Sequence, residues 1–286
     1  KEWQQVQSFA DQGLPQSALH IVDSIYRVSK AEQNTVQLLK AALFQVRLRS
    51  DYQEEFMESS IRQFRQEVAS AQEPGRQVMH SILAELYWRY YEGNRYKFLD
   101  RTTTTSPDPE DITTWDLRTL METAAEQYEL SLENPTALQK VSLDPFDPIL
   151  EIAAGSRSFR PTLYDFLVHR ALDFFMNDES SLTRPAERFE LDRADYFLPA
   201  PEFAALELSA ADTTSLKFKA LQHMQGLIKF HLADADPTAL IDADRKRLVL
   251  FVRPKDRERE FNEWGPAPGP GRPPKPIARL PEPRHP

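Results

Sequence analysis

The residues of this chain best suited to metal chemistry are its histidines, but their spacing does not pair them. No two of the six histidines stand three or four residues apart, the spacing that places two ligands on one face of a helix. His223 and His231 are eight positions apart, with Asp234 nearby, and could share a helical face. A helical metal-dependent hydrolase built on this pair is one hypothesis. We favour a structural interpretation, in which the two histidines are either solvated or lie at the edge of the core.

Other catalytic signatures are absent from the sequence. The chain has no cysteine, which excludes disulfides, thiolate metal sites and cysteine nucleophiles. It has neither a glycine-rich phosphate loop nor a Gly-x-Ser-x-Gly nucleophile motif. The acidic segment 108–111, followed by Asp116, lacks the central glycine and the distal glutamate of a calcium loop, and is typical of a helix N-terminus. We therefore predict a protein that is not an enzyme and uses no cofactor or metal.

Two groups of charged residues invite a structural interpretation instead. One lies at residues 89–101, at the C-terminal end of an aromatic stretch, and the other lies along residues 160–173. Basic residues late in a helix are ordinary partners of the helix dipole, whereas buried Arg–Asp pairs would fix how two helices meet. We favour the second reading, as a structural ion-pair network. Its members would be Arg89, Arg95, Asp100, Arg101, Arg160, Asp165, Arg170 and Asp173.

These charged groups need helices to position them, and apolar periodicity predicts helices along most of the chain. Glycine is scarce, at 8 of 286 residues, while good helix formers are plentiful. The stretch from Val78 to Arg101 is unusually aromatic, and its rings must be buried between neighbouring helices to keep the protein soluble. The residues predicted to be buried follow helical spacing and are Met79, Ile82, Leu83, Leu86, Tyr87, Tyr90 and Tyr91.

Shorter helices are predicted on both sides of the aromatic stretch. They span residues 2–10, 15–31, 35–49, 52–71, 115–132, 163–175, 216–233 and 237–251. Asn34 or Thr35 is expected to cap the third of these, and Thr114 the fifth. The apolar residues of the last helix are Leu240, Ile241, Leu248 and Phe251.

Two stretches depart from this helical pattern. Residues 177–215 are rich in proline and aspartate and are predicted to form a long ordered loop. Residues 253–286 hold ten of the 22 prolines and are expected to be a disordered, low-complexity tail, because such a composition cannot form a packed core. The apolar anchors of the long loop would be Phe189, Tyr196, Phe197 and Phe203.

An internal repeat relates the helices of the first hundred residues. The apolar stripe of residues 18–25 recurs in residues 57–64 at an offset of 39, and that of residues 39–46 recurs in residues 79–86 at an offset of 40. Such two-helix units are typical of α-solenoids. The predicted fold is therefore all-α, an α-α repeat (TPR-like) solenoid or helical array. We expect TPR-like hairpins over residues 1–101, a continuing helical region with long loops over 102–252, and the tail over 253–286.

The charge balance limits the partners of the chain. With 35 basic and 44 acidic residues, its net charge is −9, which argues against a nucleic-acid partner or an anionic membrane surface. No apolar run reaches the ~18 residues that a membrane span needs. We therefore expect protein partners, no nucleic acid and no membrane span in this segment.

Several segments carry a family resemblance. They include Leu-Ala-Glu-Leu-Tyr-Trp-Arg-Tyr-Tyr at 83–91, Arg-Pro-Thr-Leu-Tyr-Asp-Phe-Leu at 160–167 and shorter matches at 13–19, 94–96, 100–102, 111–116 and 239–248. In these segments the chain resembles the N-terminal helical region of the large alpha-2-macroglobulin-like proteins of Bacteroidota and their relatives. The resemblance covers residues 3–252 and rests on recurring sequence patterns, not on catalytic motifs.

The resemblance implies an exported protein of the periplasm or cell envelope, whose later β-sandwich domains can trap proteases. The thioester Cys-x-Glu-Gln motif of many macroglobulins cannot occur in a chain without cysteine, and the proline-rich tail departs from the family pattern. We therefore expect a non-catalytic helical scaffold or protein-interaction region of a protease-inhibitor-like parent, with other proteins or the remainder of that parent chain as partners. A free-standing TPR-like adaptor is the alternative.

Overall fold

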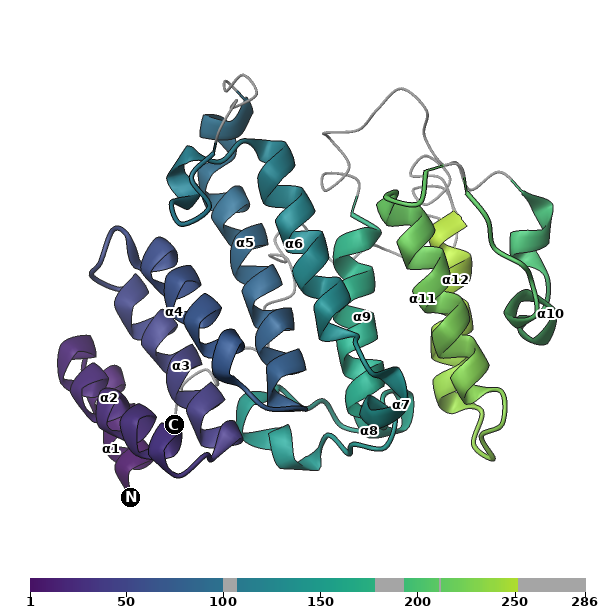
Figure 1. Cartoon of the computed structure of the whole chain (residues 1–286). Helices are drawn as coiled ribbons and strands as arrows, with labels where there is room; N and C mark the ends of the chain where they lie inside the picture. The colour runs from purple at the N-terminus through teal and green to yellow at the C-terminus, as the bar shows by residue number, and fades with distance from the viewer. Residues whose placement is uncertain (100–106, 178–192, 211, 252–286) are drawn as a thin grey trace, which may run out of the picture. The chain divides into compact units, whose positions relative to one another are not determined.

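The computed structural model describes residues 1–99, 107–177, 193–210 and 212–251, and these residues form helices and no β-strand (Figure 1). The predicted all-α class is therefore confirmed for the described part of the chain. Contacts divide the chain into an N-terminal unit, residues 1–153, and a C-terminal unit that begins at residue 154. The domain boundaries predicted after residues 101 and 252, like the proline-rich tail, lie outside the described residues.

The N-terminal unit is a series of antiparallel helices in which each packs against the next (Figure 1). The long helix α5 bends at Asn94, whose φ of −121° is not helical and whose side-chain amide donates to the carbonyl oxygen of Tyr90 at 2.9 Å. Shorter elements are η1 (Ile112–Thr114), α7 (Pro135–Leu138) and η2 (Asp144–Ile149). The main helices are α1 (Glu2–Asp11), α2 (Pro15–Ala31), α3 (Thr35–Ser50), α4 (Phe56–Ser70), α5 (Gly75–Leu99) and α6 (Leu117–Ser131).

The core of this unit is the one that the apolar periodicity predicts. All seven residues of the aromatic stripe on α5 are buried, at 4% exposure or less. The stripe repeated on α2 and α4 is also buried, apart from the half-buried Met57. Burial of these rings and aliphatic groups is the main favourable term in assembling the helices.

The helix caps follow the prediction at one position and depart from it at another. The Asn34 side chain caps α3 by accepting a hydrogen bond from the backbone N–H of Gln37 at 3.2 Å. The prediction that Thr114 caps the next long helix is wrong. Asp116 caps α6 instead, accepting from the Thr119 N–H at 2.8 Å, because its backbone is extended there while Thr114 still belongs to η1.

A Schellman motif ends both α1 and α2, with a different residue at its left-handed position. Gly13 occupies that position after α1, with φ of 70°, and Gln33 occupies it after α2, with φ of 54°. The N–H of Asn34 bonds to the carbonyl of Ser29 at 2.9 Å, which completes the motif. Left-handed backbone strains an L-residue but not glycine.

We expect Gln33→Gly to raise the free energy of unfolding by about 0.5–1 kcal/mol, because relief of the left-handed strain exceeds the entropic cost of glycine. Chemical denaturation followed by circular dichroism measures the change. Glu32→Gly is the matched control, since Glu32 has right-handed backbone with φ of −85° and should lose stability instead. A destabilised Gln33→Gly protein would contradict the assignment of the motif.

A chain of side-chain hydrogen bonds crosses α2, α3 and α4. The amide of Gln45, only 3% exposed, donates to Asp23 at 2.7 Å and accepts from Gln63 at 2.7 Å. Arg49 then donates to the carbonyl oxygen of the Gln63 amide at 2.9 Å. Buried amides of this kind specify how helices align, because each misalignment leaves polar groups unpaired.

Glu67 makes a second polar connection between α2 and α4. Its buried carboxylate accepts a hydrogen bond from the Tyr26 hydroxyl. The same carboxylate forms an ion pair with the ammonium group of Lys30, whose Nζ atom lies 2.6 Å from Oε1. Burial, and then the hydrogen bond to Glu67, raise the pKa of Tyr26, so its hydroxyl stays protonated. The two helices that the repeat relates are thus linked directly through this buried carboxylate.

The C-terminal unit is built around α9, α11 and α12. Helix α11 packs against α9 on one side and against α12 and α10 elsewhere (Figure 1). Thr162 and Asp165 form a reciprocal capping box at the start of α9. The elements of the unit are α8 (Ser156–Phe159), α9 (Leu163–Phe175), η4 (Ala194–Phe197), α10 (Ala200–Ala204), α11 (Leu216–His231) and α12 (Thr238–Phe251).

The described part of the long segment between α9 and α11 contains two short helices, η4 and α10. Tyr196 and Phe203 are buried anchors there, as predicted. The prediction for Phe197 is wrong, because its side chain is 52% exposed. Phe189 lies outside the described residues.

The large apolar residues named for the last helix do not form the buried face of α12. Ile241 and Leu248 are exposed, and the buried stripe consists of Ala239, Ala243 and Arg247. The two small alanines leave room for a neighbouring helix, and the buried arginine finds carbonyl acceptors, as described below. Leu240 is half-buried, and the side chain of Phe251 lies outside the described part. Among the described residues, none of the helices is both long and apolar enough to cross a membrane.

Candidate functional site

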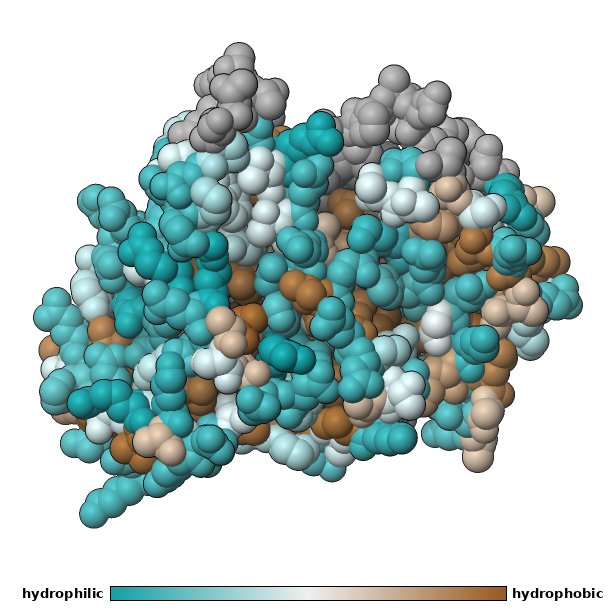
Figure 2. All heavy atoms as spheres, viewed as in Figure 1, coloured by the Kyte–Doolittle hydropathy of each residue, from teal (hydrophilic) through white to brown (hydrophobic). Residues whose placement is uncertain are grey.

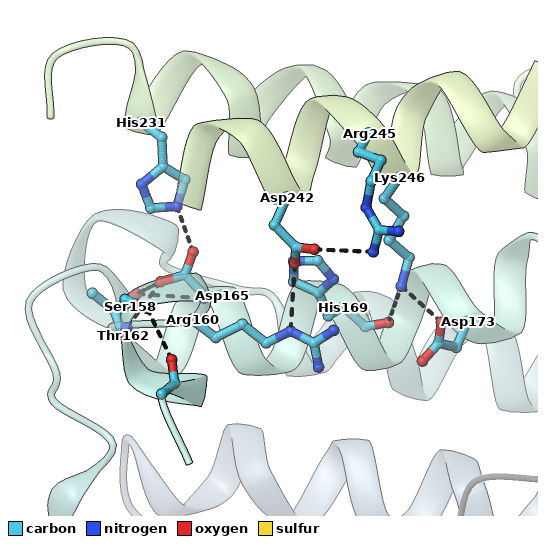
Figure 3. Close-up of polar contacts among 11 residues, drawn as sticks. Ser158, Arg160, Thr162, Asp165, His169, Asp173, His231, Asp242, Arg245 and Lys246 are labelled. Carbon is cyan, nitrogen blue, oxygen red and sulfur yellow. Dashed lines mark hydrogen bonds and ion pairs between the residues drawn. The ribbon is translucent and has the colours of Figure 1, made fainter. Parts of the chain in front are cut away.

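A stripe of polar residues on α9 faces α11 and α12 in the C-terminal unit. Asp165, His169 and Asp173 follow one another at intervals of four and therefore share one helical face. Figure 3 shows side chains from α11 and α12 reaching toward this face. These side chains are His231 of α11 and Asp242 and Lys246 of α12.

The innermost pair of this stripe joins His231 to Asp165, and both side chains are 1% exposed. The Nε2 atom of His231 lies 2.5 Å from Oδ1 of Asp165, and its Nδ1 atom lies 2.6 Å from Oδ2 of Asp234. The other carboxylate oxygen of Asp165 accepts from the backbone N–H and the hydroxyl of Thr162, at 2.8 and 2.6 Å. Since both ring nitrogens face carboxylate oxygens, both must donate, and His231 is an imidazolium cation.

The stability of this unit should fall as the pH rises past neutrality. Burial acts to lower the pKa of His231, but the hydrogen bonds and charges of Asp165 and Asp234 outweigh it and raise the pKa above 6.5. A raised folded-state pKa stabilises the fold fully below the unfolded value and loses that contribution as the pH rises through the folded value. Amide hydrogen exchange of α11 at about pH 6 and about pH 9, corrected for intrinsic rates, measures this.

His231→Gln is the control for that measurement, because glutamine keeps a hydrogen-bonding side chain but does not titrate. We expect the variant to have lower protection in α11 and to lose the part of the pH dependence that the histidine supplies. If wild type and variant show the same pH profile, His231 is not charged in the folded state.

A second carboxylate, Asp242 of α12, lies near basic groups of α9, of α12 itself and of Arg160, the residue that follows α8. Its Oδ2 atom lies 3.7 Å from Nε2 of His169 and 4.0 Å from Nε of Arg160. Arg245, on the same helix, reaches Oδ1 at 3.5 Å but is 76% exposed. Since these distances exceed those of strong hydrogen bonds, Asp242 supplies mainly a local charge that orients α12 on α9.

Lys246 closes the outer end of the stripe. Its ammonium group lies 2.7 Å from the Asp173 carboxylate and donates to the backbone carbonyl of His169 at 3.3 Å. Burial lowers the pKa of Lys246, although the nearby Asp173 acts in the opposite direction. Asp173 is 66% exposed, so water screens much of this ion pair.

Arg247 is the largest fully buried side chain in the described part of the chain, at 1% exposure. Its guanidinium donates to the backbone carbonyls of Tyr196 and Leu198, the latter at 2.9 Å, and pairs with Asp244 at 2.7 Å. It also lies over the ring of Phe203, 4.4 Å from the centroid. One side chain of α12 therefore holds both η4 and α10 in place.

The charged residues singled out in the sequence are distributed over several local pairs. Arg89 pairs with Glu85 on its own helix at 3.1 Å, and Arg95 lies over the Tyr91 ring. Arg170 lies over the ring of Phe166. Asp100 and Arg101 lie outside the described residues. The partners of the remaining three, Arg160, Asp165 and Asp173, are Asp242, His231 and Lys246.

The two histidines of the hydrolase hypothesis have separate environments. The ring of His223 stacks on Phe175 with centroids 5.7 Å apart, while His231 is held between two carboxylates. Among the residues with described positions, no group of three or more histidine or carboxylate side chains is arranged to hold a metal ion. The polar groups of α9, α11 and α12 thus serve one another and position helices.

A cleft of about 410 Å³ opens in the N-terminal unit beside α4. Its apolar wall consists of Ile61, Tyr87, Ile112 and Trp115, which are all buried at 6% exposure or less. The rings of Tyr87 and Trp115 stack with centroids 5.6 Å apart. Its charged rim consists of Glu55, Glu58, Arg62, Arg65, Glu110 and Asp111, and Figure 2 shows that the surface over α4 is mainly hydrophilic.

Arg65 of the rim joins α4 to the segment that contains η1. Arg65 donates to the carbonyl of Pro109 at 2.7 Å and pairs with Glu110 at 2.9 Å. Hydrogen bonds from Thr113, together with the charge of Arg62, lower the pKa of Asp111. The segment is therefore fastened to α4 and completes the cleft.

The hydroxyl of Tyr87 is a polar group in the apolar wall of this cleft. Only 2% of the surface of Tyr87 is exposed. Its hydroxyl makes no hydrogen bond within the described residues. Burial raises the pKa of Tyr87 to about 12, so the group is a neutral phenol. An unmatched hydroxyl at the wall of a cleft is suited to bind a ligand with hydrogen-bond donors or acceptors.

The sequence does not predict this cleft, because helical spacing identifies Tyr87 only as a core residue. A signal exists in α4, where Glu58, Ile61, Arg62 and Arg65 share one face that mixes charge with apolar surface. Comparison with protein-family models, curated proteins and solved structures finds no match for this chain.

Proposed function

We propose that the chain is a non-catalytic helical scaffold or protein-interaction region, of the kind that stands at the N-terminus of alpha-2-macroglobulin-like envelope proteins. In this proposal α2–α5 are two TPR-like repeats of an α-solenoid. The observation that carries it is the serial packing of these helices with the buried stripes that recur at offsets of 39 and 40. Helical arrays of this type offer extended surfaces to protein partners.

The polar groups support a structural role over a catalytic one. Asp165, His231 and Arg247 are buried and bonded to other parts of the protein, so they stabilise the arrangement of the helices. The cleft beside α4, in contrast, has a charged rim and an unmatched hydroxyl, which suits binding. A binding surface on a rigid array is the function that accounts for both features.

Partner capture tests the interaction role. The chain, immobilised through a terminal tag, is incubated with an envelope fraction of the source cells, with and without excess soluble chain as competitor. We expect a defined protein, or a further part of the parent polypeptide, to be recovered and to be displaced by the competitor. Recovery of nothing that the competitor displaces would contradict an interaction role.

Two further measurements test the lineage and the absence of catalysis. β-Sandwich sequence encoded in frame after Val252 is expected for a macroglobulin-like parent, whereas a complete gene without it would favour the free-standing adaptor. Metal analysis of the purified chain is expected to find no stoichiometric zinc or iron. Stoichiometric metal would favour the hydrolase hypothesis.

A further inference from the structure

The cleft beside α4 holds more information about a partner than its size alone. Its rim contains four carboxylates and two guanidinium groups. Arg65 is paired with Glu110, and Asp111 accepts hydrogen bonds from Thr113. Arg62 makes no ion pair within the described residues, so it adds one positive charge to a rim whose four carboxylates still outnumber its two guanidinium groups. The carboxylates of Glu55 and Glu58 remain, and neither makes an ion pair or side-chain hydrogen bond within the described residues.

These two carboxylates belong to the start of α4. Glu55 is the N-cap residue, and Glu58 lies in the first turn on the face that also carries Ile61. Ile61, Tyr87 and Trp115 form the adjacent apolar wall. Free negative charge thus borders apolar and aromatic surface, and the Tyr87 hydroxyl adds a hydrogen-bonding group to that wall.

We propose that this cleft binds an arginine side chain presented by a protein partner. A guanidinium group is planar, weakly hydrated and carries five N–H donors, so it suits a site that combines carboxylates, aromatic rings and a phenol oxygen. Glu55 and Glu58 bind the positive charge, the Tyr87 oxygen accepts one N–H, and the alkyl stem packs against the apolar wall. This inference rests on the proposed interaction role and specifies its chemistry.

An anionic ligand fits the same cleft less well. Arg65 already donates to a carbonyl and a carboxylate, so an anion bound there would have to displace Glu110. Arg62 supplies a single positive charge, which the carboxylates of Glu55 and Glu58 outnumber. These two carboxylates would repel the anion. A neutral ligand would leave both carboxylates without a counter-charge.

The test uses three short peptides that differ at one position. Acetyl-Gly-Arg-Gly-amide is titrated into the full chain beside its citrulline and lysine analogues, and the indole N–H resonance of Trp115 is followed by NMR. We expect saturable binding of the arginine peptide at millimolar concentration. Citrulline, which keeps the shape and loses the charge, should bind about tenfold more weakly, and lysine should fall between them.

Variants of the protein separate the cleft from non-specific attraction. Glu58→Gln should weaken binding of the arginine peptide about tenfold, and Tyr87→Phe about threefold to tenfold while it keeps the ring stack. Glu122→Gln is the matched control, because Glu122 is an exposed acid on α6 that pairs with Arg118, and it should leave binding unchanged. Circular dichroism verifies that each variant is folded.

Several results would overturn the inference. These are no saturable binding of the arginine peptide, equal binding of the citrulline peptide, equal loss in Glu58→Gln and Glu122→Gln, or a larger Trp115 shift with inorganic phosphate. The outcome is distinct from that of partner capture. A captured partner retained equally by wild type and Glu58→Gln would keep the interaction role and reject this cleft. Specific peptide binding without a captured partner would support the guanidinium site and contradict a protein partner as the source of the arginine.

Discussion

Asp165→Ala is expected to lower the free energy of unfolding of the C-terminal unit by about 3–5 kcal/mol, because it leaves the buried His231 without its closest counter-charge. The change also removes one half of the Thr162 capping box. Amide hydrogen exchange of α9 and α11 measures the loss locally, which matters because the described part of this unit contains no tryptophan.

Asp173→Ala is the matched control for this prediction. It removes an aspartate from the same helix and the same face, but from an ion pair in which the acid is 66% exposed. We expect a loss of only about 0–1 kcal/mol. Unchanged exchange and unchanged melting of Asp165→Ala would remove the support for a structural ion-pair network.

Arg247→Ala is the second change with a large expected effect, about 3–5 kcal/mol. The substitution leaves the carbonyls of Tyr196 and Leu198 without their hydrogen-bond donor. It also creates a cavity beside the ring of Phe203 and removes the contacts of this side chain that join α12 to η4 and α10. Hydrogen exchange in residues 194–204 should rise most. Arg247→Lys should lose part of this stability, because a single ammonium group cannot reach both carbonyls as the forked guanidinium does.

Arg245→Ala controls for the loss of one positive charge on α12. Its guanidinium is 76% exposed and lies 3.5 Å from Asp242, so the variant should melt within about 0.5 kcal/mol of wild type. Equal effects of the two alanine substitutions would mean that Arg247 contributes only its charge, and not the contacts to η4 and α10.

Apolar periodicity was enough to predict the buried faces of the longest helices. The stripe on α5 was correct because each of its residues is apolar and the helical period alone decides which face is buried. Periodicity does not reveal the buried face of α12, where Arg247 is buried and Ile241 is exposed. The acceptors that make this burial favourable lie about fifty positions earlier in the chain, and no local pattern contains them.

The candidate sites were harder to predict for the same reason. The sequence predicts a structural charge at Asp165, but its partner His231 is 66 positions away, and spacing alone places that histidine with His223. The cleft depends on α4, one ring of α5 and the segment near η1, which meet only after folding. Spacing within one helix identifies a face but does not identify what that face meets.

The hydrogen-bond chain from Asp23 through Gln45 and Gln63 to Arg49 bears on how the N-terminal unit tolerates insertions. Its four members come from three helices and each bond needs one particular axial position, so a slip of α3 by one turn, about 5.4 Å, would disconnect the whole series. Apolar side chains can repack after such a slip, but fixed amides cannot. Evolution can therefore lengthen the loops between these helices more readily than it can add a residue inside α3.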